Sequence, residues 1–412
     1  MIMDCEKYTG LCVCGREHTL ETRKVVVEDN ALAHFEDYMA ELGLTGRRVA
    51  VYDENTWRLT EGRHVKADQN IVLDPNGLRA EDVQIEKMME QLDKPDVIIA
   101  VGAGTIMDFG RYPAYKLHIP FVAVPTLASS DGFTANICSA ILNGQKKSTP
   151  MCAPVLVCAD LGIISGAPKR LIASGINDIL AKYISLADWR MSKLVADEYY
   201  CPVVADLAEH ALQLMRAAAD KYAATGEADH EAMTMAQMES GLTMQLLDHS
   251  RAASGAEHLM AHIVEMHPPR LENAEGIHGE CVGVGTFACI REYHKLAGMT
   301  PKAKPFTPIS EQWVLEKFGP RLTPGIMKEN ANDVLGTFDP QNIVDHWDEI
   351  KAMLDALPSV EEMETLYQKC GCKYLPEHIG IDPAIADEVL DMSAAIRNRL
   401  TLIRMKRVLD FS

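Results

Sequence analysis

The sequence has no apolar stretch that approaches the roughly 18 residues needed to cross a membrane. The segment Met1–Lys7 carries early acids and no apolar core, so we expect no secretory signal. Positive charge is scarce as well, because 40 Lys and Arg residues stand against 59 Asp and Glu residues, for a formal charge of -19. This excess of acid disfavours non-specific binding to nucleic acid or to an anionic membrane, although a local basic cluster can still bind a small anion.

Regularly spaced cysteine pairs are missing too. Eleven cysteines spread over 412 residues fit a reducing cytoplasm better than a disulfide framework, so we expect a cytoplasmic protein. The sequence also lacks internal repeats and long low-complexity tracts. Its length suits roughly two or three domains, and its 47% hydrophobic content is ordinary for a globular chain.

The first part of the chain alternates strand-like and helix-like segments. Strands are expected at residues 48–52, 96–101 and 120–126, and a helix at residues 105–117. Further strand-like runs occur around Asn143-Gly144 and at residues 154–157. This alternation predicts a parallel sheet with crossover helices.

Long helical patterns dominate from about Pro168 onward, at residues 180–195, 203–224, 230–247 and 383–408. Pairs such as Pro268-Pro269 and Gly319-Pro320 separate them. We therefore expect an α/β domain at residues 1–162 and a helical domain at residues 163–412, with the boundary placed to within several residues.

A glycine-rich turn, Val101-Gly102-Ala103-Gly104-Thr105, stands between an expected strand and an expected helix. Glycines let the backbone approach a phosphate, and a helix N-terminus attracts negative charge. The third glycine of the dinucleotide fingerprint is missing, because position 107 is Met. A plain strand-to-helix turn is the alternative.

The loop Thr126–Gly132 follows the next strand, where open α/β sheets bind ligands. Its hydroxyl groups are candidates to contact a cofactor, and Asp131 is a candidate to accept hydrogen bonds from a substrate hydroxyl. The alternative is an ordinary turn stabilised by Ser and Asp side chains.

Asp178, His258 and His278 are candidate ligands of a divalent metal. One carboxylate and two imidazoles can hold such an ion and leave a coordination position open for substrate. His258 and His262 are four residues apart and share one face if the segment is helical. Both have structural alternatives: the histidines as a packed or solvated pair, and Asp178 as the N-cap or first-turn acid of a helix.

A second group of potential metal ligands occurs near the N-terminus. Cys12-x-Cys14-Gly15-x-x-His18, with Cys5 nearby, could form a small metal knuckle, although no second ligand pair has the regular spacing of a zinc finger. Such a knuckle would suit a metal-binding module without catalysis. Cys370-Gly371-Cys372 has no supporting pattern.

Five motifs follow one another in an order that carries a family resemblance. They are Val101-Gly-Ala-Gly-Thr-Ile-Met-Asp108, Pro125-Thr-Leu-Ala-Ser-Ser-Asp-Gly-Phe-Thr134, Ala167-Pro-Lys-Arg-Leu-Ile-Ala-Ser-Gly-Ile-Asn-Asp178, Ser250-Arg-Ala-Ala-Ser-Gly-Ala-Glu-His258 and His278-Gly-Glu-Cys-Val-Gly-Val-Gly285. The chain resembles the sn-glycerol-1-phosphate dehydrogenases, especially the bacterial arabinose-operon members, over roughly residues 15–300. These enzymes belong to the superfamily of dehydroquinate synthase, glycerol dehydrogenase and iron-dependent alcohol dehydrogenase.

The resemblance implies a Rossmann-like parallel-sheet domain, an all-helical C-terminal domain and an active site in the cleft between them. It implies that Asp178, His258 and His278 bind zinc or nickel, that His262 sits beside the substrate and that Asp131 touches it. It also implies a homodimer or larger homo-oligomer. The residues implied to hold NAD(H) or NADP(H), together with Gly102 of the same turn, are Gly104, Thr105, Ile106, Met107, Asp108, Thr126, Leu127, Ala128 and Ser129.

The sequence departs from the family pattern at several positions. Ala103 replaces a glycine of the phosphate turn, Ala135 replaces a serine often found after the substrate Asp, and Ala252 replaces a proline before the metal helix. His258 and His278 are 20 residues apart, a longer interval than is typical. The substrate is therefore less firmly predicted than the class of reaction.

The resulting hypothesis is a metal-dependent dehydrogenase that interconverts dihydroxyacetone phosphate and sn-glycerol 1-phosphate by hydride transfer. His262 is a candidate proton relay and Arg251 a candidate contact for the substrate phosphate. Asp53, after an early strand, is a candidate to bind the adenosine ribose, which favours NAD while leaving NADP open. The alternatives are a related polyol dehydrogenase such as glycerol dehydrogenase, a dehydroquinate synthase-like cyclase, and a non-catalytic homologue that binds metal and dinucleotide.

Overall fold

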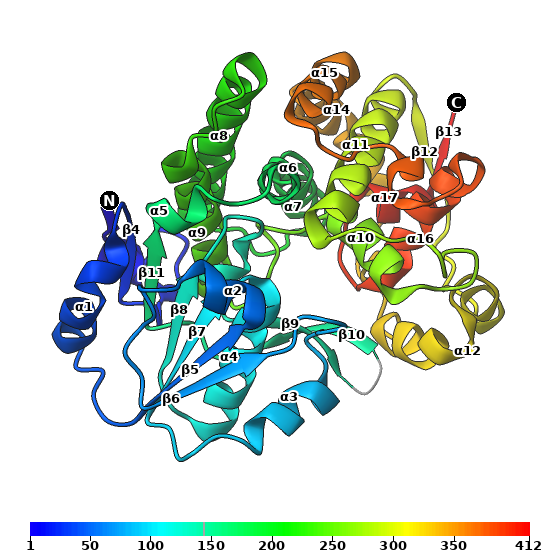
Figure 1. Cartoon of the computed structure of the whole chain (residues 1–412). Coiled ribbons are helices and arrows are strands. Elements are labelled where there is room, and N and C mark those ends of the chain that lie inside the picture. The colour runs from blue at the N-terminus through cyan, green and yellow to red at the C-terminus, as the bar shows by residue number, and fades with distance from the viewer. Residues whose placement is uncertain (143–144) are drawn as a thin grey trace.

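Seven strands form one sheet in the first part of the chain, as the computed structural model, which describes residues 1–142 and 145–412, shows (Figure 1). All neighbouring strands are parallel except the first, which pairs antiparallel with β4. The expected parallel sheet is therefore confirmed. In spatial order the strands are β1 (Ile2–Met3), β4 (Lys24–Glu28), β11 (Leu156–Asp160), β8 (Phe121–Pro125), β7 (Val97–Gly102), β5 (Arg48–Asp53) and β6 (Gln69–Leu73).

The two faces of the sheet pack into two separate apolar cores, because successive side chains of a strand point to opposite faces. In β7, Ile98 and Ala100 belong to the core that is shared with α4 (Gly104–Leu117). Ile99 and Val101 belong to the core against α1 (Phe35–Glu41). Strands buried on both faces are almost wholly apolar, which explains why they stand out in the sequence.

Shorter elements complete the first part of the chain. They are the hairpin of β2 (Gly10–Leu11) and β3 (Glu17–His18), the ribbon of β9 (Ile137–Leu142) and β10 (Gln145–Pro150), and the helices α2 (Glu54–Leu59) and α3 (Asp82–Met89). Strand-like runs were expected around Asn143-Gly144; these two residues lie outside the described residues, and β9 and β10 stand on either side of them in the sequence.

Helices make up most of the chain after the last sheet strand, which ends at Asp160. They are α5 (Leu161–Ile164), α6 (Lys169–Leu180), α7 (Lys182–Ala196), α8 (Pro202–Thr225), α9 (His230–Leu247), α10 (Ala256–Met266), α11 (His278–Ala297), α12 (Glu311–Glu329), α13 (Gln341–Asp345), α14 (Trp347–Asp355), α15 (Val360–Cys370), α16 (Ala386–Ile396) and α17 (Leu402–Met405). Within the described residues, no helix combines the length and the apolar character that crossing a bilayer requires.

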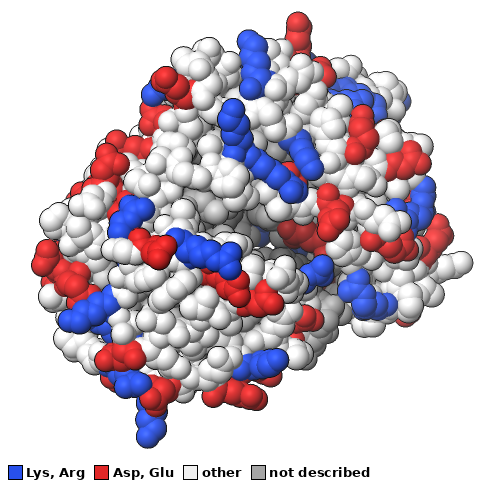
Figure 2. Space-filling view, in the orientation of Figure 1, with Lys and Arg blue, Asp and Glu red and all other residues white. Residues whose placement is uncertain are grey.

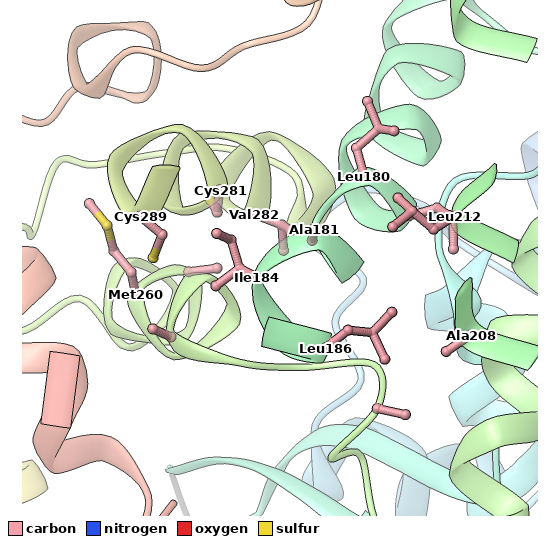
Figure 3. Packing of buried hydrophobic residues seen from close by; sticks show 14 of the residues in the cluster. Leu180, Ala181, Ile184, Leu186, Ala208, Leu212, Met260, Cys281, Val282 and Cys289 are labelled. Carbon is pink, nitrogen blue, oxygen red and sulfur yellow. The ribbon is translucent and has the colours of Figure 1, made fainter. Parts of the chain in front are cut away.

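Helix α7 lies at the centre of the helical part. Figure 3 shows Ile184 of α7 between Val282 of α11 and Met260 of α10, while Leu212 of α8 approaches from the other side. The same apolar cluster extends to the sheet, because it includes residues such as Val25. One face of the sheet and the helices thus share the larger of the two buried cores. The division into two domains near residue 162 stays a prediction.

Three expectations about local structure need correction. The pattern at residues 383–408 is not one helix, because the chain is extended at Arg397 between α16 and α17, and the Arg404 guanidinium binds the carbonyl oxygens of Ala394 and Arg397 there. The C-terminal part is not wholly helical either, since β12 (Pro301–Ala303) pairs with β13 (Leu409–Phe411). Asp178 is not an N-cap, because it lies within α6.

Helices α6 and α11 cross closely at Gly279. A Cβ atom at this position would lie 2.1 Å from the carbonyl oxygen of Ser174. We expect Gly279→Ala to lower the free energy of unfolding by about 1–3 kcal/mol, because an added methyl group forces the two backbones apart. Chemical denaturation would measure the loss.

The matched control for this change is Gly298→Ala at the end of the same helix. A Cβ atom there would meet its nearest neighbour, the Lys295 carbonyl oxygen, at an ordinary 3.5 Å. Equal stability of the two variants would contradict the close-packing argument.

Candidate active site

A cavity of about 590 Å³ lies between the carboxyl edge of the sheet and helices α10 and α11. Figure 2 shows a hollow at the middle of the face that is turned to the viewer, with both acidic and basic side chains at its rim. One end of the cavity is lined by the start of α4 and the loop after β8, and the other by His258, His262 and His278. The cavity therefore joins the predicted cofactor turn to the predicted metal ligands.

The three predicted metal ligands meet in space. The Nε2 atoms of His258 and His278 lie 3.4 and 3.6 Å from Oδ1 of Asp178. Each ligand comes from a different helix: Asp178 from α6, His258 from α10, and His278 from the first position of α11. Asp178 is fully buried and His258 almost so, whereas His278 is partly exposed toward the cavity.

These atoms fit a divalent metal. Ligand atoms around a tetrahedral zinc lie about 3.4 Å apart, given metal–ligand bonds of roughly 2.0–2.2 Å. The Oδ1 atom of Asp178 is buried and accepts no hydrogen bond, while its Oδ2 accepts one from the backbone N–H of Asp131 at 2.9 Å. A buried carboxylate oxygen without a partner is costly, and a cation between it and the two imidazoles would satisfy it.

Two glutamates orient the histidine ligands. Oε1 of Glu257 lies 2.8 Å from Nδ1 of His258, and Oε1 of Glu265 lies 2.8 Å from Nδ1 of His278. A carboxylate can only accept at these positions when ionised, so each Nδ1 carries the proton and each Nε2 is free to bind a metal. Such outer partners fix the tautomer and strengthen the ligand.

The buried charges of the site shift one another's pKa values. Burial opposes ionisation of Asp178, but the Lys182 ammonium and the neighbouring histidines hold the pKa of Asp178 below its ordinary value. Burial also disfavours a charged His258, yet the adjacent carboxylates of Asp178 and Glu257 raise the pKa of His258 to about 9. A proton therefore competes with a metal for His258, and metal binding must release it.

Asp131 lines the cavity and is held rigidly. Its Oδ2 atom accepts a hydrogen bond from Ser240 and an ion pair from Lys182, both at 2.8 Å. Lys182 is fully buried and also donates to the Asp178 carbonyl oxygen at 2.7 Å. One lysine thus fixes both the predicted substrate contact and the helix turn that carries a metal ligand.

His262 lies at the metal end of the cavity. Its Nδ1 atom is 3.0 Å from Oε2 of Glu265, so Glu265 bridges His262 and His278. Burial lowers the pKa of His262 to about 4, which makes the imidazole neutral at physiological pH. A neutral imidazole beside the metal ligands can accept or donate one proton.

The predicted cofactor residues surround the other end of the cavity. Ala103 precedes α4 and offers no side chain to cap it, so the first N–H groups of the helix are available to a phosphate. The residues of this set that line the cavity are Gly104, Thr105, Met107, Asp108 and Ser129. The residues that stand behind them without lining it are Gly102, Ile106, Thr126, Leu127 and Ala128.

Two further predicted residues lie apart from the cavity lining. Asp53 ends β5 and caps α2, where its side chain accepts a hydrogen bond from the Thr56 N–H at 2.8 Å. Arg251 is buried, and its guanidinium binds Glu198 and the carbonyl oxygens of Asp188 and Leu400. Those internal bonds hold Arg251 against the chain before α10, while its Nη1 atom has no hydrogen-bond partner within the described residues.

Sequence reasoning missed Lys182, Ser240, Glu257 and Glu265. Glu265 had a usable signal, because His258, His262 and Glu265 recur at helical spacing and share one face of α10. Lys182 follows Asp178 by four residues, and this helical spacing could have indicated that the two side chains lie on the same side where α6 meets α7. Ser240 lies on α9 and has no local pattern that connects it to Asp131.

Comparison with known proteins places this geometry in context. Residues 26–168 match the family described as iron-containing alcohol dehydrogenase. The glycerol-1-phosphate dehydrogenase [NAD(P)+] of Geobacillus stearothermophilus is 34% identical, over 97% of this chain and 96% of that protein. The protein of the same name from Halalkalibacterium halodurans is 29% identical, over 98% and 97% of the two chains.

Solved structures show the same fold. An iron-containing alcohol dehydrogenase from Corynebacterium glutamicum superposes with a TM-score of 0.62 at 14% identity, over 94% of this chain and 95% of that one. A probable glycerol dehydrogenase from Sinorhizobium meliloti gives 0.55 at 16% identity, over 88% and 97%. The similarity thus extends through both the sheet and the helices.

Glu265 offers a test of the ligand geometry. We expect Glu265→Gln to weaken binding of a divalent metal about 10–100-fold, because the amide carries no charge to hold the imidazoles of His262 and His278. His258→Ala, which removes a ligand outright, should abolish metal binding at this site. Titration against a competing chelator would measure both affinities.

Glu275→Gln is the control for this titration, since Glu275 lines the same cavity from an exposed position without contacting a ligand. Unchanged metal affinity in Glu265→Gln would show that Glu265 does not orient the site.

Proposed function

The chain belongs to the glycerol-1-phosphate dehydrogenase family, and from this premise we propose that it interconverts dihydroxyacetone phosphate and sn-glycerol 1-phosphate by hydride transfer. NAD(H) or NADP(H) and one divalent metal are the cofactors. The observation that carries the proposal is the continuous cavity, which places an uncapped helix N-terminus and a three-ligand metal site around one space. Such an arrangement suits a reaction between a nicotinamide and a polarised carbonyl.

The protein's own residues orient the reaction. When bound, the metal supplies Lewis-acid polarisation of a carbonyl oxygen and the nicotinamide supplies the hydride. Asp178, His258 and His278 provide three ligands and leave a position for substrate. Asp131, fixed by Lys182, presents its carboxylate to a substrate hydroxyl. His262 is neutral and stands where it can move the proton of the alcohol.

The same residues support a proposal for which metal and which nicotinamide cofactor the protein binds. Nitrogen and oxygen ligands with an open position suit zinc or nickel, and we propose one of these as the native metal. Asp53 lies at the carboxyl end of a strand next to β7, where a carboxylate accepts hydrogen bonds from a ribose and repels a 2′-phosphate. This position supports a preference for NAD over NADP.

We propose a reducing cellular setting from the cysteines and self-association from the family resemblance. The eleven cysteines form no disulfide within the described residues, as expected for a cytoplasmic protein. A homodimer or larger homo-oligomer is proposed from the family resemblance. We propose no nucleic-acid partner, because the chain carries a formal charge of -19.

An arginine cluster beside the cavity suits the phosphate of the substrate. Arg399 donates hydrogen bonds to the Ser250 hydroxyl and the Ser254 carbonyl oxygen, and both serines line the cavity. Burial and the nearby charges of Arg251 and Arg397 lower the pKa of Arg399 to about 9. Mutual repulsion of three guanidinium groups is relieved when an anion binds among them.

Arg397 is the member of this cluster whose guanidinium has no internal partner of its own among the described residues. Its guanidinium forms no hydrogen bond or close ion pair within the described residues, and its charge contributes to the lowered pKa of His262. We therefore propose Arg397, in place of Arg251, as the principal contact of the substrate phosphate.

The reaction itself is tested by following NADH and NADPH oxidation with dihydroxyacetone phosphate. We expect oxidation by the metal-reconstituted protein and none by the chelated protein, with sn-glycerol 1-phosphate as the product when its stereochemistry is analysed. Bound metal and cofactor without turnover would contradict the proposal. Oxidation with unphosphorylated polyols alone would favour a glycerol dehydrogenase, and conversion without lasting loss of NADH would favour a cyclase.

Arg397→Gln tests recognition of the phosphate. We expect kcat/KM for dihydroxyacetone phosphate to fall about 10–100-fold, because a hydrogen bond to a charged group contributes roughly 1.5–3 kcal/mol. The rate with dihydroxyacetone, which lacks the phosphate, should not change. Steady-state kinetics with both substrates provide the comparison.

Arg291→Gln, an exposed arginine on α11, serves as the control for a general loss of positive charge. An equal loss with both substrates in Arg397→Gln would indicate a structural role for Arg397 instead.

A further inference from the structure

Four potential metal ligands meet at the N-terminal hairpin, apart from the active site. Cys12, Cys14 and His18 come from the hairpin of β2 and β3, and Cys201 precedes the first residue of α8. Their ligand atoms all lie within 4.8 Å of one another. Cys5, which is near them in sequence, is not part of the group and has its thiol 3.9 Å from the Met3 carbonyl oxygen.

The turn of the hairpin brings its three ligands together. The Cys12 N–H donates to the Arg16 carbonyl oxygen and the Gly15 N–H to the Cys12 carbonyl oxygen, both at 2.9 Å. Gly15 has a φ of 83°, a left-handed conformation that glycine adopts without strain. This tight turn lets Cys12, Cys14 and His18 face one point.

The distances match a tetrahedral zinc site. Sγ of Cys12 lies 3.7 Å from Sγ of Cys201, and Nε2 of His18 lies 3.4 Å from Sγ of Cys14 and 3.3 Å from Sγ of Cys201. Around a tetrahedral zinc, two sulfurs lie about 3.8 Å apart and a sulfur and a nitrogen about 3.5 Å apart. A disulfide requires about 2.05 Å between sulfurs, so the Cys12–Cys201 separation excludes a covalent bond and leaves room for an ion bound by both sulfurs.

The surroundings prepare His18 as a ligand. Its Nδ1 atom lies 2.7 Å from the Leu246 carbonyl oxygen at the end of α9. A carbonyl oxygen only accepts hydrogen bonds, so Nδ1 carries the proton and Nε2 presents its lone pair to the sulfurs. His18 is 4% exposed, which makes this tautomer a fixed feature of the core.

The sulfur of Cys14 also has an outer partner. The Tyr199 hydroxyl lies 3.1 Å from Sγ of Cys14, where it can donate to a thiolate. The Arg16 guanidinium lies over the Tyr199 ring, 3.4 Å from its centroid, and brings positive charge to the thiolate-rich group. Hydrogen bonds to ligand sulfurs are typical of metal sites.

The large apolar side chains of this hairpin do not hold it against the core. Leu11 and Val13 are 85% and 84% exposed, and the two paired strands are only two residues long. An isolated hairpin of this size is marginally stable in water, so another interaction must fix it against α8 and α9.

We propose that Cys12, Cys14, His18 and Cys201 bind a structural zinc ion that joins the N-terminal hairpin to the helical part of the chain. Three thiolates and one imidazole select zinc among common divalent ions and complete its tetrahedron, which leaves no position for a substrate. The ion would link segments that are 183 residues apart in sequence, and metal binding would contribute directly to folding.

The position of this zinc connects it to the active-site wall. Cys201 ends the segment that carries Glu198, and Glu198 binds the Arg251 guanidinium at 3.1 Å. Arg251 adjoins Ser250, which lines the cavity. Fixing Cys201 therefore also restrains the chain that enters α10. The zinc proposal itself does not depend on the proposed enzymatic function.

Elemental analysis of the full-length protein tests the proposal. We expect two metal equivalents per chain in the wild type supplied with zinc. The His258→Ala variant should keep one equivalent, and the Cys12→Ser/Cys14→Ser variant should keep only the active-site equivalent. Cys5→Ser, a buried cysteine of the same segment, is the matched control and should keep both.

Spectroscopy on a variant that keeps all four proposed ligands tests the site even if the cysteine variants fail to fold. X-ray absorption of zinc-loaded His258→Ala should show sulfur ligands at about 2.3 Å, and its cobalt form should show sulfur-to-metal charge transfer. An absence of retained zinc in this variant, or only oxygen and nitrogen ligands, would overturn the proposal. A Cys12–Cys201 disulfide in the purified protein would overturn it as well.

Discussion

Close packing of three helices is the constraint on which the active-site geometry depends. Asp178, His258 and His278 lie on α6, α10 and α11, so these helices must approach one another closely for the ligand atoms to meet. Small residues at the crossings allow this approach: a Cβ at Gly279 would lie 2.1 Å from the Ser174 carbonyl oxygen, and one at Gly285 would lie 2.3 Å from that of Glu257. The absence of side chains at these positions therefore fixes the distances between the ligands.

That packing buries more negative charge than the protein alone neutralises. Asp131, Asp178 and Glu257 are all buried, and Lys182 is the fully buried lysine that faces the first two. Removing charge from water is expensive unless a partner offsets it. The pKa of His258 is raised by the same excess of negative charge from Asp178 and Glu257. A divalent cation supplies the missing positive charge, and so the charge balance and the ligand geometry favour the same occupant.

Sequence patterns predicted the parts of this structure that depend on local periodicity or ordered motifs. The strands at 48–53, 97–102 and 121–125 are apolar runs buried on both faces, and α10 places His258 and His262 on one face. Long-range contacts were not predictable in this way. Arg251 carries the charge that a phosphate needs, and its burial against Glu198 is visible only in the structure. Arg397 interrupts an apparently continuous helical pattern, and its extended backbone is visible only in the structure.

The two groups of metal ligands show why one was visible in the sequence and the other was not. The active-site ligands stand in motifs that recur in a known order, whereas Cys12, Cys14 and His18 lack a local fourth ligand, which Cys201 supplies from the start of α8. Their chemistry also differs: a carboxylate and two imidazoles leave a coordination position open, and three thiolates with one imidazole close it. The contact between Glu198 and Arg251 connects the segment of Cys201 to the chain that leads into α10. An ion that holds the hairpin would therefore also help to keep His258 in place.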